Sequence, residues 1–350
     1  MADRQTGIHL GKQHLIQHFS RCQIAHFARN GGCTESAGSI GRSDRCQPAL
    51  LAGVKMKLIV NADDFGMCRA ANEAVFDLFR RGCLKSSTVM IPCPAAEEAA
   101  RFAAENPQYA IGVHLTTTSE WDTYKWGPLT GAKSLKEETG FMTHHAADAE
   151  SRADLKELEA ELKAQIEQAR AWGMEPSHLD NHMGSLYGHN TGRFEVMELT
   201  LRICGEYGKA FRLFTDAHEL IPFPGIPMEM QQQLLGMIRP WAQKYGVPMP
   251  NYLLMPNWTE DLRTSYEHYR EEILKIWVNI PEGITETFVH PCVEDDEMKT
   301  IIRKWRDRVW EYQLMGDPYT HQYLKNHGVE LISYRDLVEM RKNEFPAYKA

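Results

Sequence analysis

The sequence lacks three features that would each have indicated a particular class of protein. No apolar run approaches the roughly 18 residues that a transmembrane helix needs. No two of the eight cysteines stand at C-x-x-C spacing, so neither a disulfide framework nor a thiolate zinc site is predicted. The formal net charge is −8, without the positive excess that favours binding to nucleic acid or to a membrane surface. We therefore expect a globular cytoplasmic protein with neither of these partners.

The segment of residues 1–55 differs in composition from the rest of the chain. It is rich in Gly, Ser and His, basic and poor in acids, and it shows no sustained periodicity. We predict that it is a disordered extension. Because Met56 directly precedes the first predicted strand, translation that starts there would place the extension upstream of the natural start. Residues 56–350 then form a single domain.

From Met56 onward, short apolar runs alternate with amphipathic stretches, which is typical of an α/β protein with parallel strands. The predicted strands cover residues 58–61, 86–91, 110–115, 177–181, 210–214, 252–255, 285–290 and 330–333. Eight strands that alternate with helices predict a distorted, TIM-like (β/α) barrel. The 350 residues, 43% of them hydrophobic, suffice for its core.

Two helices between the strands have the clearest periodicity. The first is expected from Ser151 to Trp172, with Ser151 as its N-cap and Gly173 as its stop. The second follows the apolar positions from Leu262 to Trp277, which are mostly aromatic. Such aromatic faces belong either to the core or to an interface, so a homodimer stays open, although core packing explains most of them.

Two segments, residues 116–147 and 219–250, are too long for ordinary connections between strands and helices. Loops of this length are usually functional or contain elements of their own. The first carries Trp121, Tyr124 and Trp126, a composition suited to stacking on a sugar ring and equally suited to packing the loop onto the barrel. Trp126 is therefore a candidate substrate contact.

Two adjacent acids, Asp63 and Asp64, follow the first predicted strand. In α/β sheets and barrels, ligands and catalytic groups gather at the carboxyl ends of the strands. Neighbouring carboxylates repel each other and are costly to desolvate together, so a bound cation is one reason to keep them there. The alternative is that one acid caps the next helix and the other is solvated.

Histidines end three further predicted strands. His114 ends the third strand and His290 the seventh. In the fourth strand, alternation along an extended chain places His178, Asp180 and His182 on one face. We expect these groups to converge on one site with the paired acids.

One carboxylate with two imidazoles is the donor set of a catalytic divalent metal, and it favours zinc or another transition metal over calcium. Such an ion acidifies water and polarises a carbonyl, and a second carboxylate can accept the proton of the water. The pattern therefore predicts hydrolysis of an amide or ester.

Five motifs in this order resemble the YdjC-like (ChbG/HpnK) carbohydrate deacetylase family. They are VNADDFG at 60–66, IGVHL at 111–115, PSHLDNH at 176–182, FVHP at 288–291 and SYRDL at 333–337. The resemblance implies a distorted (β/α) barrel that removes acetyl groups from N-acetylated sugars with one divalent metal ion, zinc or magnesium. It further implies Asp64, His114 and His182 as ligands, Asp63 as general base, and His290 as acid or electrostatic stabiliser.

Three residues complete the candidate site. Arg212 is similar to a family arginine that orients the acidic residues, and His178 and Asp180 are expected in the second shell or against the substrate. One departure concerns the segment after His182, where many members have further histidines and this chain has Met-Gly-Ser. If those histidines line the sugar site in the family, the departure implies a subgroup with a different substrate.

Two other functions remain open from the sequence. The barrel could hydrolyse another small polar amide or ester, because one fold hosts many chemistries. It could also bind a sugar without turnover, although a binding protein would not need Asp63 and His290 at these places.

Overall fold

A computed structural model describes residues 56–221, 226–255 and 263–348. The predicted disordered extension, residues 1–55, lies outside the described residues, as does Leu262. No helix within the described ranges is long and apolar enough to cross a membrane.

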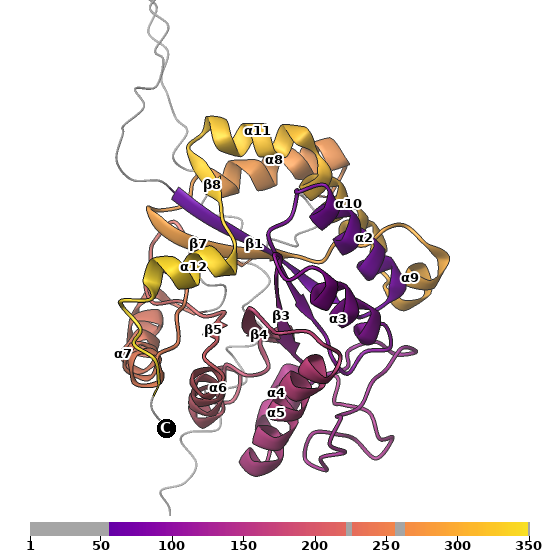
Figure 1. The fold of residues 1–350 in the computed structure, drawn as a ribbon, viewed down its shortest axis with the longest axis vertical. Coiled ribbons are helices and arrows are strands. Elements are labelled where there is room, and N and C mark those ends of the chain that lie inside the picture. Colours follow the sequence, from indigo (N-terminus) through magenta and orange to yellow (C-terminus); the bar gives the residue numbers. More distant parts are fainter. Residues whose placement is uncertain (1–55, 222–225, 256–262, 349–350) are drawn as a thin grey trace, which may run out of the picture. The chain divides into compact units, whose positions relative to one another are not determined.

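Eight parallel strands form one curled sheet with helices on its outside (Figure 1). They are β1 (Met56–Phe65), β2 (Ser86–Val89), β3 (Ala110–Leu115), β4 (His178–Asn181), β5 (Ala210–Phe211), β6 (Tyr252–Leu253), β7 (Gly283–Val289) and β8 (Val329–Leu331). Their spatial order is β5, β4, β3, β2, β1, β7, β6, and β8 pairs with β1. The predicted α/β fold with eight parallel strands is confirmed.

The central strand, β1, has different neighbours along its length. Its first three residues, Met56–Leu58, pair with β8, and its residues from Asn61 onward pair with β2. On the other side, β7 pairs with the whole stretch from Met56 to Ala62. All side chains from Leu58 to Phe65 are buried. The acids at the end of β1 therefore lie in the interior of the domain.

The barrel is distorted between β5 and β6, which are two residues long each. Here the flanking backbone joins the two sides, because Phe211 N donates to Pro248 O at 3.0 Å and Asp216 N donates to Asn251 O at 2.9 Å. The barrel, which was expected to be irregular, thus has its weakest strand pairing between β5 and β6.

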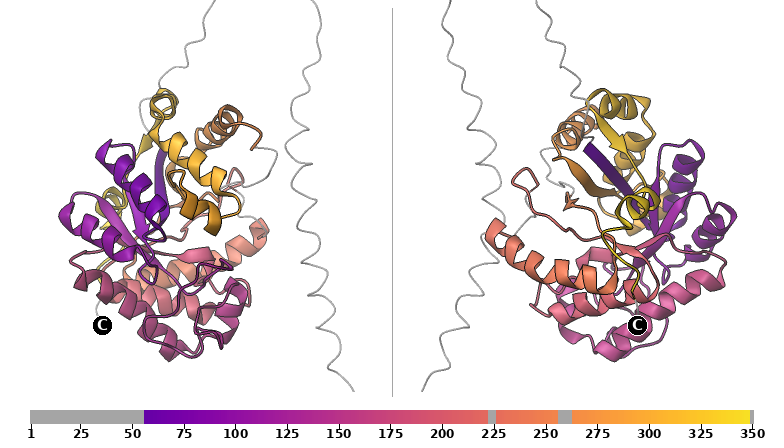
Figure 2. Two further views of the ribbon diagram at one scale, coloured as in Figure 1. Left: turned by 90° about the vertical axis from the view of Figure 1, so that its right-hand side faces the viewer. Right: turned by 60° about the vertical axis from the view of Figure 1, so that its left-hand side comes forward.

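Helices cover the outer face of the sheet, as the two further views in Figure 2 show. The helices are α2 (Arg69–Arg80), α3 (Ala96–Glu105), α4 (Ala146–Arg152), α5 (Leu155–Ala171), α6 (Phe194–Glu206), α7 (Met228–Tyr245), α8 (Tyr266–Trp277), α9 (Asp296–Ile301), α10 (Trp305–Gly316), α11 (Pro318–Asn326) and α12 (Tyr334–Arg341), with a 3₁₀ turn at His182–Gly184. Their apolar faces join the main core cluster, for example through Leu158, Leu162 and Ile166 of α5.

The predicted N-cap at Ser151 is wrong. The chain forms two helices there, since α4 ends at Arg152 and α5 begins at Leu155. Asp154 is the cap of α5, because its carboxylate accepts from Lys156 N at 2.9 Å and from Glu157 N at 3.1 Å. Ser151 instead donates to the carbonyl of Asp148 within α4.

The two long segments differ in content. The segment 219–250 contains α7, so it is not a loop of that length. The segment 116–147 has no helix before α4, and it is held by isolated bridges that pair Thr118 with Thr143 and Lys136 with Met142. Glu161 of α5 also accepts from the backbone of Leu129 and Thr130 at 3.0 and 2.9 Å.

Replacement of the observed cap tests the start of α5. We expect Asp154→Ala to lower the free energy of unfolding by about 1 kcal/mol, because two backbone amides lose their acceptor. Ser151→Ala is the matched control and is expected to change stability by less than about 0.5 kcal/mol. Urea denaturation followed by circular dichroism measures both. Equal losses in the two variants would contradict the assignment of the cap.

Candidate metal centre

The end of β1 brings two adjacent carboxylates into the same cavity. Adjacent residues of a regular strand point to opposite faces, but the pairing of β1 with β2 shifts its register between Ala62 and Phe65. Asp64 also has a φ of 60°, which is strained for a residue other than glycine. Both Asp63 and Asp64 consequently line one cavity. Strain of this kind concentrates at functional sites.

Gly66 makes this turn feasible. Its φ is 85°, and a Cβ atom there would lie 2.9 Å from the Cα of Ala96, so a side chain would collide with backbone. The turn places the first turn of α2 directly after the acids.

Asp64, His114 and His182 form a group that could hold a metal ion. Asp64 Oδ1 lies 3.6 Å from His114 Nε2 and 3.4 Å from His182 Nδ1. All three residues are buried. Asp64 Oδ2 lies 2.7 Å from Arg308 Nη1, so the charge of the carboxylate is partly compensated, while Oδ1 faces the two imidazoles. A cation held between Oδ1 and the two imidazoles would compensate the buried carboxylate further. The residues present therefore fit a divalent ion.

A second group, Asp63, His114 and Asp180, also has metal-like spacing. Arg212 already binds both oxygens of Asp63, since its Nη1 and Nη2 donate to Asp63 at 2.6 Å, and its Nη2 lies 2.9 Å from Asp180 Oδ2. In the first group Arg308 contacts only Oδ2 of Asp64, so the first group is the better candidate for an ion.

Both histidines of the first group are oriented by carboxylates. His114 Nδ1 lies 2.7 Å from Asp180 Oδ1, which leaves Nε2 toward Asp64. His182 Nε2 lies 2.8 Å from Glu120 Oε2, which leaves Nδ1 toward Asp64. Carboxylates that bind the second nitrogen of a ligating histidine fix its tautomer and its direction. Asp180 and Glu120 thus each hold one histidine of the group, and the sequence pattern did not reveal Glu120.

The environment of His182 favours its protonated form in the absence of an ion. Burial by itself lowers the pKa of His182, but the charges of Glu120 and Asp64 and hydrogen bonds to both outweigh burial and raise the pKa to about 10. At neutral pH, His182 must therefore release a proton before Nδ1 can bind a metal ion.

Arg212, directly after β5, links the ends of three other strands. Besides Asp63 and Asp180 it bonds Glu286 of β7, to which its Nε donates at 2.7 Å. Arg212 is 2% exposed and its guanidinium lies 4.7 Å from the centroid of the Phe288 ring. Burial raises the pKa of Asp63, but the charge of Arg212 outweighs it, so the pKa lies below 3.8. Asp63 is therefore ionised at neutral pH.

His290, directly after β7, lines the same cavity as these acids. Its backbone N donates to Glu311 Oε2 at 2.6 Å, and its Nδ1 lies 3.6 Å from the same oxygen. Burial lowers the pKa of His290, but the hydrogen bond to Glu311 and the charge of Asp64 outweigh it and raise the pKa above 6.5. Glu311 thereby favours the protonated form of His290.

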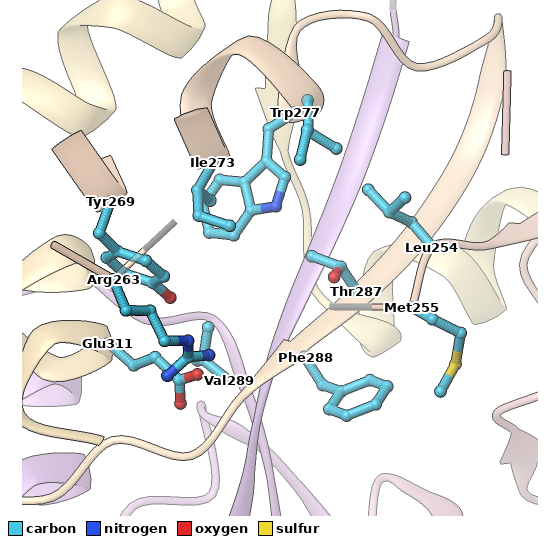
Figure 3. Close-up of a pocket in the computed structure, with 11 residues that line it drawn as sticks. Leu254, Met255, Arg263, Tyr269, Ile273, Trp277, Thr287, Phe288, Val289 and Glu311 are labelled. Carbon is cyan, nitrogen blue, oxygen red and sulfur yellow. The ribbon is translucent and has the colours of Figure 1, made fainter. Parts of the chain in front are cut away.

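Glu311 also borders a small second cavity of about 20 Å³, which Arg263 and Tyr269 line with it (Figure 3). Arg263 pairs with Asp307 of α10, yet its Nε has no hydrogen bond among the described residues. The space is about that of one water molecule, which can satisfy such a group.

The main cavity has a volume of about 320 Å³ and opens beside the acids. Its apolar wall consists of Trp121, Met183, Tyr187, Leu253, Met255, Phe288 and Ile302. Met183 stands 44% exposed, with a strained φ of 56°. Lys304, Asp307 and Arg308 of the α10 region add charged groups. A cavity of this size suits a ligand of one or two sugar rings.

Three predicted site residues do not line the main cavity: Asp180, which binds His114 from behind, His178 and Trp126. His178 is buried, with Nε2 3.2 Å from Asn61 Oδ1 and its ring stacked on Tyr334 at 3.7 Å. Trp126 is 3% exposed, donates from Nε1 to the carbonyl of Thr118, and packs behind His182. Trp121 from the same loop reaches the cavity instead.

The proton on His182 gives a test of the Glu120 contact. We expect Zn²⁺ binding at pH 7 to release about one proton per ion in the wild type, and clearly less in Glu120→Gln, because loss of the carboxylate lowers the pKa of His182. Calorimetric titration in two buffers of different ionisation enthalpy measures the release. Glu138→Gln, an exposed position on the same loop, is the control. Equal proton release by all three proteins would contradict the role of Glu120.

Known proteins similar to this chain cover the whole barrel. Carbohydrate deacetylase 1 of Listeria innocua serovar 6a is 27% identical over 286 residues, which are 81% of this chain and 100% of the relative. The carbohydrate deacetylase of Geobacillus stearothermophilus is 26% identical over 283 residues, 81% of this chain and 98% of the relative.

A solved structure from Enterococcus faecalis V583, provisionally named a cellobiose-phosphate cleavage protein, supports the fold. It is 24% identical, has a TM-score of 0.63, and matches over 81% of this chain and 99% of its own. The family model described as YdjC-like protein matches residues 57–326, a range that contains every residue of the metal centre. The chain therefore belongs to the YdjC-like protein family.

Proposed function

We propose that this chain is a metal-dependent carbohydrate deacetylase, which hydrolyses the amide bond of an N-acetylated sugar. The observation that carries the proposal is the buried Asp64 carboxylate, whose Oδ1 faces two imidazoles while Arg308 contacts only Oδ2. The relatives named carbohydrate deacetylase support the same reaction.

The donor set favours a transition metal. Two nitrogen ligands and one oxygen ligand suit zinc better than magnesium, which prefers oxygen ligands and water. Asp64, His114 and His182 would hold the ion. When bound, the ion supplies Lewis acidity that acidifies water and polarises the amide carbonyl.

Asp63 is the proposed general base. Its Oδ2 lies 4.0 Å from His114 Nε2, so it faces the ligand side of the centre. Arg212 binds both oxygens and Asn61 donates to Oδ1 at 2.8 Å, which fixes the carboxylate plane. The low pKa of Asp63 keeps it ionised but makes it a weak base, so Asp63 would accept the proton only from a water that is more acidic than bulk water.

His290 is the proposed general acid. The hydrogen bond to Glu311 raises the pKa of His290 and so favours the protonated form, which can give the leaving amine nitrogen the proton that it needs. It comes from β7, whereas Asp63 comes from β1, and both line the main cavity. A tetrahedral carbon between them would receive the water from one side and lose the amine toward the other.

The partner is accordingly a small carbohydrate. The state of the cysteines agrees with the expected cytoplasmic location. Within the described part of the chain, Cys68, Cys83, Cys93, Cys204 and Cys292 are free thiols. Free thiols are common in reducing compartments. A homodimer remains a prediction, as does the choice between sugars.

Acetate release tests the activity. Protein stripped of metal and resupplied with zinc, magnesium, manganese or cobalt is incubated with N-acetylated mono- and oligosaccharides, and free acetate is assayed. We expect release that depends on the added metal. If no sugar of the panel yields acetate although metal is demonstrably bound, the result would favour another small polar amide or ester as substrate, or sugar binding without turnover.

Replacement of the base tests the mechanism. We expect Asp63→Asn to lower kcat by at least about 100-fold, because the amide cannot accept the proton of the water. The bound metal content should stay that of the wild type, since Asp64, His114 and His182 remain. Asp122→Asn, an exposed acid beside the cavity, is the control. Loss of the ion from Asp63→Asn would show that Asp63 is a ligand rather than the base.

A further inference from the structure

Arg308 of α10 contacts the carboxylate that we assign to the metal ion. Its Nη1 lies 2.7 Å from Asp64 Oδ2, and the two side chains are 12% and 1% exposed. The residues are far apart in the sequence and meet because the carbonyl of Arg308 accepts from Cys292 N at 3.2 Å, which fixes α10 beside the segment after His290. The guanidinium also lies 5.8 Å from the centroid of the Trp121 ring.

The two oxygens of Asp64 consequently face different partners. Oδ1 faces His114 and His182, and Oδ2 faces Arg308. A guanidinium that occupies one oxygen leaves the other for the ion. Coordination through one oxygen keeps positions of the ion open for water and a substrate carbonyl, which a catalytic site requires.

The contact also makes binding of the ion electrostatically less favourable. Arg308 remains charged at every pH at which the protein is folded. A positive charge that close to the ligand carboxylate repels a divalent cation on the other oxygen, and within a buried site this repulsion is poorly screened. Removing the arginine would also leave Asp64 as an unpaired buried carboxylate, which favours the ion-bound form further.

We propose that Arg308 is a positioning residue of the metal centre: it holds Asp64 to one-oxygen coordination and lowers the affinity of the site for its ion. This inference rests on the proposed metal centre but goes beyond it. Neutralising Arg308 should therefore tighten metal binding, which is the reverse of what loss of an ordinary supporting contact does.

The test measures metal binding rather than turnover. Arg308→Gln and Arg308→Lys are compared with the wild type by competition for Co²⁺ with a chromophoric chelator and by the visible absorption of the bound Co²⁺. Arg306→Gln, an exposed arginine two residues away on the same helix, is the control. Circular dichroism reports whether each variant is folded.

We expect Arg308→Gln to bind Co²⁺ at least about 10-fold more tightly, with weaker visible absorption because Asp64 then binds through both oxygens and adds a ligand. Arg308→Lys keeps the charge but cannot form the same planar contact, so we expect a near wild-type affinity with an altered spectrum. Arg306→Gln should match the wild type in both readouts.

Unchanged or weaker binding by folded Arg308→Gln, with an unchanged spectrum, would overturn the inference. If Arg308→Gln does not fold, the Co²⁺ spectrum of Arg308→Lys decides. A spectrum equal to that of the wild type overturns the inference, and an altered spectrum supports it. Failure of the wild type itself to bind Co²⁺ would instead refute the metal centre and the proposed function, so the two failures are distinct.

Discussion

The buried guanidinium of Arg212 is the contact on which the site depends. It holds Asp63, Asp180 and Glu286, which come from β1, β4 and β7. Removing one partner from a buried ion network typically costs about 3–5 kcal/mol, because the remaining charges lose their compensation. The ends of these strands are therefore held together by charge as much as by sheet pairing. Through Asp180 the same network also directs His114 toward the ion.

One guanidinium cannot neutralise three carboxylates, and the carboxylate whose negative charge is compensated least is that of Glu286. Burial raises the pKa of Glu286 to about 7, and the hydroxyl of Tyr334 bonds its other oxygen. Asp63 receives two contacts from Arg212 and keeps a low pKa. Near neutral pH the proton of the network therefore resides on Glu286 before it resides on Asp63. This difference gives a physical reason why Asp63, rather than Glu286, is available to accept a proton from water.

The sequence predicted the strands, and hence the place of the ligands, because the carboxyl ends of parallel strands share one edge. The sequence did not predict that Glu120 and Arg308 lie at the site. Their positions depend on the path of a loop and on the packing of α10, and neither of these leaves a local sequence pattern. His178 shows a second limit. The alternation that would align His178 with His182 ends at Asn181, where the chain enters a 3₁₀ turn. The cap of α5 shows a third: Ser151 and Asp154 both satisfy the local rule, and the break after α4 decides between them.

The loop of residues 116–147 joins substrate binding to metal binding. Glu120 orients His182, while the adjacent Trp121 forms part of the cavity wall and lies beside Arg308. Trp126 fills the space behind His182, which restricts where the loop can go. A change of loop sequence that reshapes the cavity for another sugar therefore acts on the same backbone that directs a ligand. If His182 holds an ion and the cavity a sugar, as proposed, this single loop would couple selectivity for the sugar to the strength of metal binding.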